Sequence, residues 1–508
     1  MHPSCFAMLA ALSIPTMLSA QCLPLGLSID ASGGRLGDAW RVDMNGTPSV
    51  PGFLGLDLLP GPTATPIGTV CLGLSPAVQV IPFLFDVAGI AAYTGSMPPT
   101  PAFVGISVYA AAISFDASQP GGFGLSNGDS ITLREPRFWF VNPGSASPFG
   151  TTPGAIAATD TIGDTLAFSQ ALTTTVRDAD TVPERGWLVL LLGNGSLAAY
   201  DGTVPVPVFT ATLTGAAGAA TKVLALPGGD ALLLLSFGTA PSPFGGGTPG
   251  SIHRVSLPGG AVTSTALPAG NPDDLILVPG TTMAFLRLAN AVVPFDHASS
   301  VLSPSIPLPS GVGGLVDWQI SGSLLYCLQG GQAAGPFGGG QPAAISVVDV
   351  GSQSVLFTNP LAMAAPATML RAGPGSAGAA LYAYGSTAAA LHELAQGSVL
   401  PVATIPVGSG ITAMELSTLG TQWLMLCNGA GCGGPAVLGM QVGTTAAVPL
   451  TPLPGAPLGA IAISASAGYS KGCIVVGGNV ATPFIAEPFV PTTTTLLPIG
   501  GVSRIVSD

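Results

Sequence analysis

A short apolar segment recurs from residue 136 to the C-terminus and limits the folds open to this chain. One residue marks each copy: Val176, Val223, Leu275, Leu315, Met369, Met414, Ile461 and Ile505. Neighbouring copies lie 40 to 54 residues apart, with a mean of about 47. The four-stranded blades of a β-propeller repeat at about 40–50 residues. The spacing therefore predicts an all-β propeller in which these segments are the inner strands.

The second strand of each repeat is also visible as an apolar run. These runs are Arg137–Asn142, Trp187–Leu192, Ala231–Phe237, Met283–Leu288, Leu324–Leu328, Ala380–Tyr384, Trp423–Cys427 and Cys473–Val476. The first run has no inner strand before it, and the C-terminal segment Gly500–Asp508 has no strands after it. We therefore expect eight blades, closed by pairing of the C-terminal strand with the first run. Seven blades is the alternative, if that run belongs to the front domain.

Composition excludes several classes of protein. Charged residues make up 7% of the chain, and the formal net charge is −12, so no basic patch is present to bind nucleic acid. Gly and Pro are abundant, but 48% of the residues are hydrophobic and they occur in short runs typical of buried strands. None of these runs approaches the roughly 20 residues of a transmembrane helix. We expect no membrane span and a monomer.

Residues 1–20 resemble a secretory signal peptide. Phe6–Leu12 and Ile14–Leu18 are apolar, and Leu18-Ser19-Ala20 is a small-residue cleavage site. The alternative is a buried N-terminal strand. The signal predicts a secreted protein, extracellular or periplasmic and associated with the cell envelope.

Residues 22–135 are predicted to form a small antiparallel β-sandwich. Candidate strands are Ala39–Met44, Gly52–Leu59, Val80–Phe85, Val104–Phe115 and Ser130–Leu133. Turn sequences such as Asn45–Pro48 and Ala117–Gly122 separate them. Their spacing is typical of sandwiches.

Short matches across about 110 residues add a resemblance to a known module. The matching segments are Asn45–Pro48, Cys71–Pro76, Asp86–Gly89, Pro101–Tyr109, Ala111–Asp116 and Gly124–Asn127. This pattern resembles the N-terminal module of planctomycete-type exported proteins, here followed by a propeller of YVTN/WD40-like repeats. The match departs after Tyr109, where a Gln is expected near Ala111. The resemblance implies export and no catalytic residue.

Six cysteines remain after removal of the signal peptide. Cys22 and Cys71 lie in the front domain, and Cys427 and Cys432 flank a Gly-rich loop. Each pair is a candidate disulfide in an oxidising compartment. A metal site at Cys427 and Cys432 is the alternative, but no nearby His or Cys completes four ligands.

A Pro-Phe-Gly motif occurs in three predicted hairpin loops. The phenylalanines are Phe149, Phe244 and Phe337, and each loop follows a second strand. Equivalent hairpins of a propeller emerge on the same face. We therefore expect a shared docking rim, with flexible linkers as the alternative.

Charge is concentrated in the predicted inner strands. These windows hold 11 of the 25 charged residues from residue 136 onward, although even spreading over their length predicts about 4. A wet central channel tolerates charge better than the packing between blades does. The more specific hypothesis is a ligand or Ca²⁺ site at the channel mouth. Its candidate residues are Asp178, Asp180, Asp273, Asp274, Asp317, Arg371, Glu415 and Arg504.

No catalytic residue is predicted. Two GxSxG matches, at Ser126 and Ser470, lack the following helix that a nucleophile elbow needs. We therefore expect a non-catalytic scaffold that binds a protein or a cell-surface glycan. The alternative is a propeller hydrolase, lyase or lactonase that uses a divalent cation at the channel mouth.

Overall fold

The computed structural model describes residues 24–36, 39–96, 100–134, 136–147, 150–160, 165–238, 248–267, 271–309, 313–333, 339–361, 366–429, 431–457, 461–466, 469–486, 489–492 and 494–507. The fold is all-β. Packing divides it into two compact units. The first takes in the chain up to Ser32, Trp40–Gly95 and Gly105–Leu133, and the second takes in Gly33–Ala39, Ser96–Val104 and Arg134 onward. The described residues include no helix long and apolar enough to cross a membrane.

The first unit contains two main antiparallel sheets and a separate hairpin. One sheet has the order β1-β2-β7, with strands Ser28–Ser32, Ala39–Asn45 and Ile90–Ser96. The other has the order β10-β8-β3-β6, with strands Asp129–Thr132, Ser107–Ser114, Pro51–Asp57 and Gln79–Leu84, and β9 (Gly124–Leu125) beside β8. The hairpin joins β4 (Pro60–Thr65) and β5 (Gly68–Leu72). Short 3₁₀ turns occupy Pro101–Phe103 and Pro120–Gly122.

Two polar side chains join these sheets. Asn127 binds both the backbone N–H and the carbonyl of Ile29 at 2.9 Å, and Asp129 accepts the N–H of Ala31 at 2.7 Å. The five strands expected from the sequence are present, with their ends shifted by up to three residues. Sequence patterning missed β1, β4, β5, β7 and β9, which are short or carry no clear alternation of apolar residues.

The second unit is a series of antiparallel sheets, numbered here in chain order. Sheet 1 contains β46 (Arg504–Ser507), β11 (Arg137–Asn142), β14 (Ala155–Asp160) and β15 (Leu166–Ala171). Sheet 2 contains β16 (Val176–Val182), β17 (Trp187–Leu192), β18 (Ser196–Tyr200) and β19 (Phe209–Thr212). Sheet 3 contains β20 (Lys222–Ala225), β21 (Ala231–Ser236), β22 (Ser251–Ser256) and β23 (Val262–Ala266). Sheet 4 contains β24 (Asp274–Leu277), β25 (Met283–Leu288), β26 (Ala291–Asp296), β27 (Val301–Leu302) and β28 (Ile306–Pro307).

The later sheets repeat the same order. Sheet 5 contains β29 (Leu315–Ser321), β30 (Leu324–Gln329), β31 (Ala344–Asp349) and β32 (Ser354–Pro360). Sheet 6 contains β33 (Ala367–Gly375), β34 (Gly378–Gly385), β35 (Ala390–Ala395) and β36 (Leu400–Pro406). Sheet 7 contains β37 (Ile411–Leu416), β38 (Gln422–Gly429), β39 (Gly434–Gln441) and β40 (Val448–Pro452). Sheet 8 contains β41 (Ala462–Ser466), β42 (Tyr469–Val476), β43 (Val480–Ala486), β44 (Phe489–Pro491) and β45 (Thr495–Leu496).

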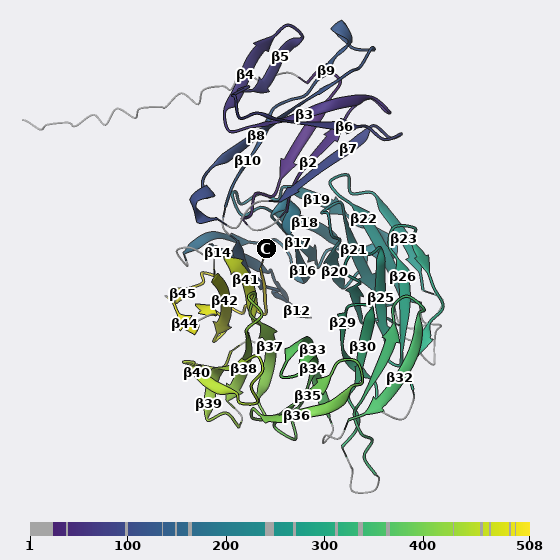
Figure 1. Ribbon diagram of the computed structural model, residues 1–508, viewed down its shortest axis with the longest axis vertical. Coiled ribbons are helices and arrows are strands. Elements are labelled where there is room, and N and C mark those ends of the chain that lie inside the picture. Colours follow the sequence, from purple (N-terminus) through teal and green to yellow (C-terminus); the bar gives the residue numbers. More distant parts are fainter. Residues whose placement is uncertain are drawn as a thin grey trace, which may run out of the picture. The chain divides into compact units, whose positions relative to one another are not determined.

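Three small elements connect these strands. A hairpin of β12 (Ser145–Ser147) and β13 (Gly150–Thr152) extends from sheet 1. A 3₁₀ turn (Pro183–Arg185) joins β16 to β17 within sheet 2, and the one-turn helix α1 (Gly215–Gly218) connects sheets 2 and 3. The arrangement is propeller-like, and the strands β16, β20, β29, β33, β37 and β41 lie toward a common centre (Figure 1).

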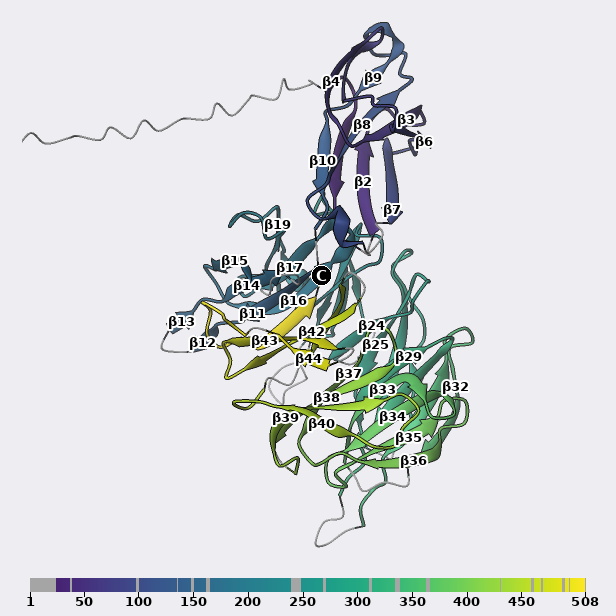
Figure 2. The same ribbon diagram turned by 60° about the vertical axis from the view of Figure 1, so that its left-hand side comes forward.

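The C-terminal strand pairs with a strand more than 350 residues earlier in the chain. In β46, Arg504 faces Val141, Ile505 faces Phe140 and Val506 faces Trp139, in an antiparallel register. The prediction that these two segments pair is confirmed. The turned view labels β11 and marks the C-terminus (Figure 2). Sheet 1 is therefore built from both ends of the second unit.

Apolar side chains fill the space between consecutive sheets. One cluster joins sheets 2 and 3, and includes Val189, Leu191 and Leu232. Another joins sheets 8 and 1, through Phe140, Cys473 and Ile505. Equivalent clusters lie between the other neighbouring sheets. Burial of each large aliphatic side chain contributes about 2 kcal/mol, so these clusters hold the sheets together.

One backbone hydrogen bond recurs in every sheet. The residue that follows the outer strand donates its N–H, at 2.7 to 3.1 Å, to a carbonyl in the connection between the second and third strands or, in sheet 7, to that of Pro435 near the start of β39. The donors are Leu172, Leu213, Leu267, Leu308, Leu361, Val407, Leu453 and Leu497. All eight are buried. Each outer edge is thereby fixed to its own hairpin before the chain enters the next sheet.

Candidate functional site: the inner strands

The charged residues predicted for the channel lie on or beside the inner strands of the second unit. Asp178 and Asp180 lie on β16, Asp274 on β24, Asp317 on β29, Arg371 on β33, Glu415 on β37 and Arg504 on β46, while Asp273 directly precedes β24. These strands lie toward a common centre (Figure 1). The structure therefore brings the predicted residues to one region, but it divides them among different strands.

Asp178 connects three sheets. Its Oδ1 forms an ion pair with Arg504 of sheet 1, and its Oδ2 accepts the backbone N–H of Val223 in sheet 3 at 2.9 Å. The Asp178 side chain is only 9% exposed, whereas that of Arg504 is 39% exposed. A buried carboxylate with both oxygens paired is poorly placed to bind a ligand, and removal of its cation would leave a buried charge unpaired.

Sheets 3, 4 and 5 are connected in the same way. Lys222 of sheet 3 lies 2.5 Å from Oδ1 of Asp274 in sheet 4. The other oxygen of Asp274 accepts the indole N–H of Trp318 in sheet 5 at 3.2 Å. Arg287 binds Asp273 at 2.7 Å and donates to the carbonyl of Val316 in sheet 5 at 3.2 Å. Sequence reasoning missed Arg287 and Trp318, although Arg287 is the one charged residue within the apolar strand β25.

Sheets 5, 6 and 7 continue the series. Asp317 accepts the N–H of Leu370 at 2.8 Å and pairs with Arg371 at 3.0 Å. Arg371 then donates to the carbonyl of Met414 in sheet 7 at 3.0 Å. The polar contacts from Arg504 to Met414 form one chain across seven sheets, which we call the inner belt. Its members connect sheets to one another by charge-assisted hydrogen bonds.

The predicted oxygen ligands of one cation, Asp178, Asp180, Asp273, Asp274 and Asp317, lie on or beside successive inner strands. Among the described residues, no group of three or more His, Cys, Asp or Glu side chains is placed to hold a metal ion. Ca²⁺ needs six to eight oxygen ligands around one point. The acids lie on successive strands instead, and four of them are engaged by a basic residue.

Asp180 and Glu415 differ from the other acids because they line a pocket. The pocket has a volume of about 300 Å³ and is formed by inner-strand residues of sheets 1, 2, 7 and 8. Its other lining residues are Thr181, Ile461, Ala462, Ile463, Ile505, Val506 and Ser507. Asp180 also accepts the N–H of Ala225 at 2.8 Å.

Burial alters the acidity of both carboxyl groups. Desolvation raises the pKa of Asp180 to about 6, against a smaller opposing effect of its backbone hydrogen bonds. Desolvation also raises the pKa of Glu415, although the charge of Arg371 lowers it. Arg371 lies 3.9 Å from Glu415, beyond hydrogen-bonding distance. The two groups therefore titrate closer to neutrality than exposed carboxyl groups do.

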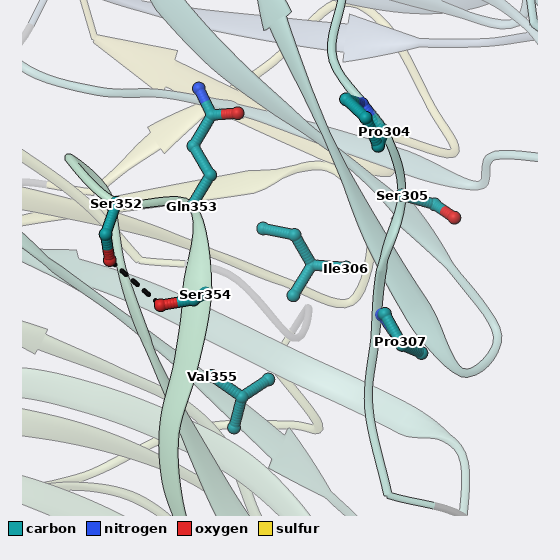
Figure 3. Close-up of a pocket in the computed structure, with 8 residues that line it drawn as sticks. All are labelled: Pro304, Ser305, Ile306, Pro307, Ser352, Gln353, Ser354 and Val355. Atoms are coloured by element: carbon teal, nitrogen blue, oxygen red, sulfur yellow. Dashed lines mark hydrogen bonds between the residues drawn. The ribbon is translucent and has the colours of Figure 1, made fainter.

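A second pocket lies at the outer strands of sheets 4 and 5. It has a volume of about 550 Å³ and is lined by Pro304–Pro307 and Ser352–Val355. Figure 3 shows Ile306 and Val355 in its wall, and the hydroxyls of Ser352 and Ser354 hydrogen bonded to each other at 2.9 Å. No lining residue titrates, so this pocket offers apolar and hydroxyl contacts without acid–base chemistry.

Within the described chain, one histidine contacts serine hydroxyls in a way that resembles a catalytic Ser–His pair. This residue is the buried His253. Its Nε2 lies 3.0 Å from the hydroxyls of Ser236 and Ser251, and its Nδ1 lies 2.8 Å from that of Ser264. Burial lowers the pKa of His253 to about 4. Because a hydroxyl occupies the place of the orienting carboxylate and the ring is fully buried, this cluster is structural.

The remaining predicted residues are three phenylalanines and four cysteines. Phe149, Phe244 and Phe337 fall outside the described residues, and so does Cys22. Cys71 is disulfide-bonded. Cys427 and Cys432 form a disulfide with their Cα atoms 6.5 Å apart, so they do not form a metal site. Cys327 and Cys473 are free and fully buried in second strands, where they act as small apolar residues.

No protein-family model matches the chain, and no curated protein matches its sequence. Similar solved structures do exist. The dihydro-heme d1 dehydrogenase NirN, in complex with DHE, is 10% identical with a TM-score of 0.53, over 73% of this chain and 74% of that chain. Sqt1 of Saccharomyces cerevisiae is 10% identical with a TM-score of 0.50, over 65% of this chain and 88% of that chain. Both are propeller-like folds, so the likeness shows an all-β, propeller-like architecture and nothing about activity.

Proposed function

We propose that this chain is an exported, non-catalytic scaffold that binds a protein or a cell-surface glycan. Its body is a closed propeller of eight blades, residues 136–508, in which β46 completes the first blade. A sandwich-like module, residues 22–135, precedes it, and residues 1–20 are the export signal. The mature protein is a monomer in the cell envelope or outside the cell.

The inner belt carries this proposal. Asp178 and Asp274 each bind two neighbouring sheets, and Asp317 binds sheet 6 through Leu370 and Arg371. Carboxylates engaged in this way support the ring and are not available to a substrate. Binding then depends on the outer surface, where loops and outer strands tolerate variation.

One observation favours the alternative enzyme. Asp180, with a pKa of about 6, shares a pocket with Glu415 and is suited to general acid–base chemistry near neutral pH. This candidate predicts hydrolase, lyase or lactonase turnover that depends on Asp180. We rank it second because the described residues hold no three-ligand metal cluster.

Closure of the ring is tested by removal of Gly500–Asp508. Loss of β46 removes the buried side chains of Val502 and Ile505, breaks the Arg504 ion pair and uncovers Trp139. We expect a loss of about 4 kcal/mol in the free energy of unfolding, measured by denaturant titration. The synthetic peptide GGVSRIVSD should restore stability, and the same peptide with Ile505→Asp should not. Unchanged stability of the truncated chain would contradict closure.

The scaffold function is tested by activity and binding measurements on one purified mature chain. We expect no turnover of ester, lactone or polysaccharide substrates with or without Ca²⁺. We expect saturable binding to a member of an array of bacterial surface polysaccharides and purified envelope proteins. Turnover that is abolished by Asp180→Asn, in a variant that melts normally, would replace this proposal with the enzyme.

A further inference from the structure

Three sheets fix the end of their second strand to the connection through which the chain enters the same sheet. In each case a neutral side chain near the end of the second strand donates a hydrogen bond to a carbonyl of that connection. The donor and acceptor residues are Asn142 and Gly500 in sheet 1, Ser236 and Ala216 in sheet 3, and Gln329 and Pro309 in sheet 5. These contacts hold the long hairpin that follows the second strand.

Sheet 7 makes the equivalent contact with a disulfide. Cys427 faces Ile411, the first residue of the inner strand β37, just as Gln329 faces the first residue of β29. Cys427 is bonded to Cys432, in the turn that follows β38. The Sγ atom of Cys432 lies 3.5 Å from the carbonyl oxygen of Val407, in the connection that enters sheet 7. The disulfide therefore takes the place of the side-chain amide in sheet 5.

The turn that carries Cys432 packs closely against this connection. Gly408 has a φ of +96°, and an added Cβ there would lie 2.6 Å from the Sγ atom of Cys432. An added Cβ on Gly431 would lie 2.8 Å from the backbone nitrogen of Ser409. The closed disulfide thus holds two backbone segments against each other with little space between them.

The same contact determines how β37 begins. The N–H of Ile411 donates to the hydroxyl of Tyr384 at 3.2 Å, and the N–H of Asn428 donates to the carbonyl of Gly410 at 2.9 Å. Further along β37, the carbonyl of Met414 accepts Arg371 at the end of the inner belt. The disulfide therefore supports the strand on which the inner belt ends.

The two sulfur atoms differ in their access to solvent. Cys427 is fully buried, whereas Cys432 is half-buried between the exposed residues Gly431 and Gly433. Thiol–disulfide exchange begins at the sulfur that a thiolate can approach, which here is that of Cys432. A buried thiol is compatible with this fold, because Cys327 and Cys473 are free and fully buried. Reduction is therefore expected to leave Cys427 inside the core.

We propose that this disulfide is a redox-sensitive switch that holds the turn of sheet 7 against the connection into β37 when oxidised and releases it when reduced. A thiolate of an external dithiol attacks the Sγ atom of Cys432, the S–S bond breaks, and Cys427 leaves with the electron pair and takes up a proton. The second thiol of the dithiol then attacks the mixed disulfide. Cys432 is released as a thiol, and the dithiol, now oxidised by two electrons, leaves as a disulfide.

The response is confined to sheet 7. Sheets 1, 3 and 5 make the equivalent contact through Asn142, Ser236 and Gln329, whose side chains have no sulfur to reduce. The other half of the switch, a buried Cys427 thiol, keeps the apolar packing of β38. Reduction is thus expected to loosen the start of β37 without unfolding the chain.

The experiment treats the full mature chain with dithiothreitol under native conditions and measures amide hydrogen exchange by mass spectrometry. We expect residues 407–416 to exchange about tenfold faster or more after reduction, because local opening exposes amides that the closed turn protects. Residues 313–321, the equivalent segment of sheet 5, are the internal control and should not change.

The double variant Cys427→Ser, Cys432→Ser separates this disulfide from that of Cys71, which dithiothreitol also reduces. We expect fast exchange of residues 407–416 in this variant before any reductant is added, and no further change in this segment afterwards. A second measurement uses the reduced wild type. Iodoacetamide should modify Cys432 and leave the buried Cys427 unmodified.

Four outcomes would overturn the proposal. The disulfide resists dithiothreitol in the folded chain, or residues 407–416 exchange at the same rate after reduction. Exchange accelerates equally in residues 313–321, or iodoacetamide modifies both cysteines equally, and either result would show general unfolding. A double variant that fails to fold would leave the decision to the reduced wild type, whose internal control reports its folding. The scaffold proposal does not depend on any of these results.

Discussion

The odd-numbered and even-numbered sheets of the second unit differ at one hairpin. In sheets 2, 4, 6 and 8 the second and third strands are joined by short turns, such as those between Leu288 and Ala291 or between Val476 and Val480. In sheets 1, 3 and 5 the same connection is long, running from Asn142 to Ala155, from Ser236 to Ser251 and from Gln329 to Ala344. Sheet 7 extends its strands to Gly429 and Gly434 and adds a disulfide. The structural repeat is therefore a pair of sheets of about 95 residues.

The residue that ends the second strand shows why the pairs differ. In sheets 1, 3 and 5 it is Asn142, Ser236 or Gln329, and in the even sheets it is Leu192, Leu288, Gly385 or Val476. Each odd residue binds its surroundings through its side chain. Asn142 accepts the N–H of Gly144 at 2.8 Å, and Ser236 donates to the carbonyl of Ala216 at 2.6 Å. A long hairpin needs such an anchor at its base, whereas a short turn is held by its own backbone.

The largest expected loss of stability comes from replacing the polar residue that ends the second strand of an odd sheet with a leucine, the residue that even sheets 2 and 4 have there. Gln329 is fully buried, donates to the carbonyls of Pro309 and Gly313 at 2.9 and 3.2 Å, and accepts from Ser346 at 3.0 Å. Gln329→Leu should cost about 3 kcal/mol, because it leaves buried carbonyls without donors. The measurement is denaturant unfolding.

Ser346→Ala is the matched control for this change. It removes two neutral hydrogen bonds, to Gln329 and Thr358, but keeps the Gln329 donations to Pro309 and Gly313, and should cost about 1–2 kcal/mol. If Gln329→Leu unfolds at the same denaturant concentration as the wild type, the side-chain anchor is not what distinguishes odd sheets.

A smaller effect tests the glycine at the base of the long hairpins. Gly238 has a φ of +73°, and an added Cβ would lie 2.4 Å from the carbonyl oxygen of Thr248. Gly280, in a turn of sheet 4, has a φ of +72° with open space around it. Gly280→Ala should cost about 1 kcal/mol from backbone strain alone, and Gly238→Ala should cost about 2 kcal/mol or more. Equal costs would show that the hairpin base has room to adjust, and would weaken the comparison.

The propeller-like architecture could be predicted from the sequence because the apolar runs and their regular spacing both indicate repeated sheets. Apolar runs such as Ala231–Phe237 mark strands that are buried on both faces, and their regular spacing predicts equivalent sheets. The partner of the C-terminal strand was also predictable, because one second strand lacked an inner neighbour. The pairing of sheets in twos was not recognised, although the three Pro-Phe-Gly loops occur at twice the single-sheet spacing. Sheet 7 carries no such motif, which concealed the fourth member.

The candidate site was only partly predictable. Sequence placed charge on the inner strands, and the structure confirms that location. It could not show which acids pair with bases, because ion pairs such as Arg504 with Asp178 join residues 326 positions apart. The sequence also could not show that Asp180 and Asp178, two positions apart on the same strand, have different surroundings. Asp178 meets a cation from sheet 1, whereas Asp180 faces a pocket shared with sheet 7.

The sequence by itself determined the strands, their repeat and the concentration of charge in the inner strands, because these follow from local patterns of apolar residues and turns. Only the tertiary structure decided the role of each charge. The local pattern is the same for an acid that meets a base on the next sheet and for one that meets a pocket. The difference arises when sheets far apart in the chain come together around one centre.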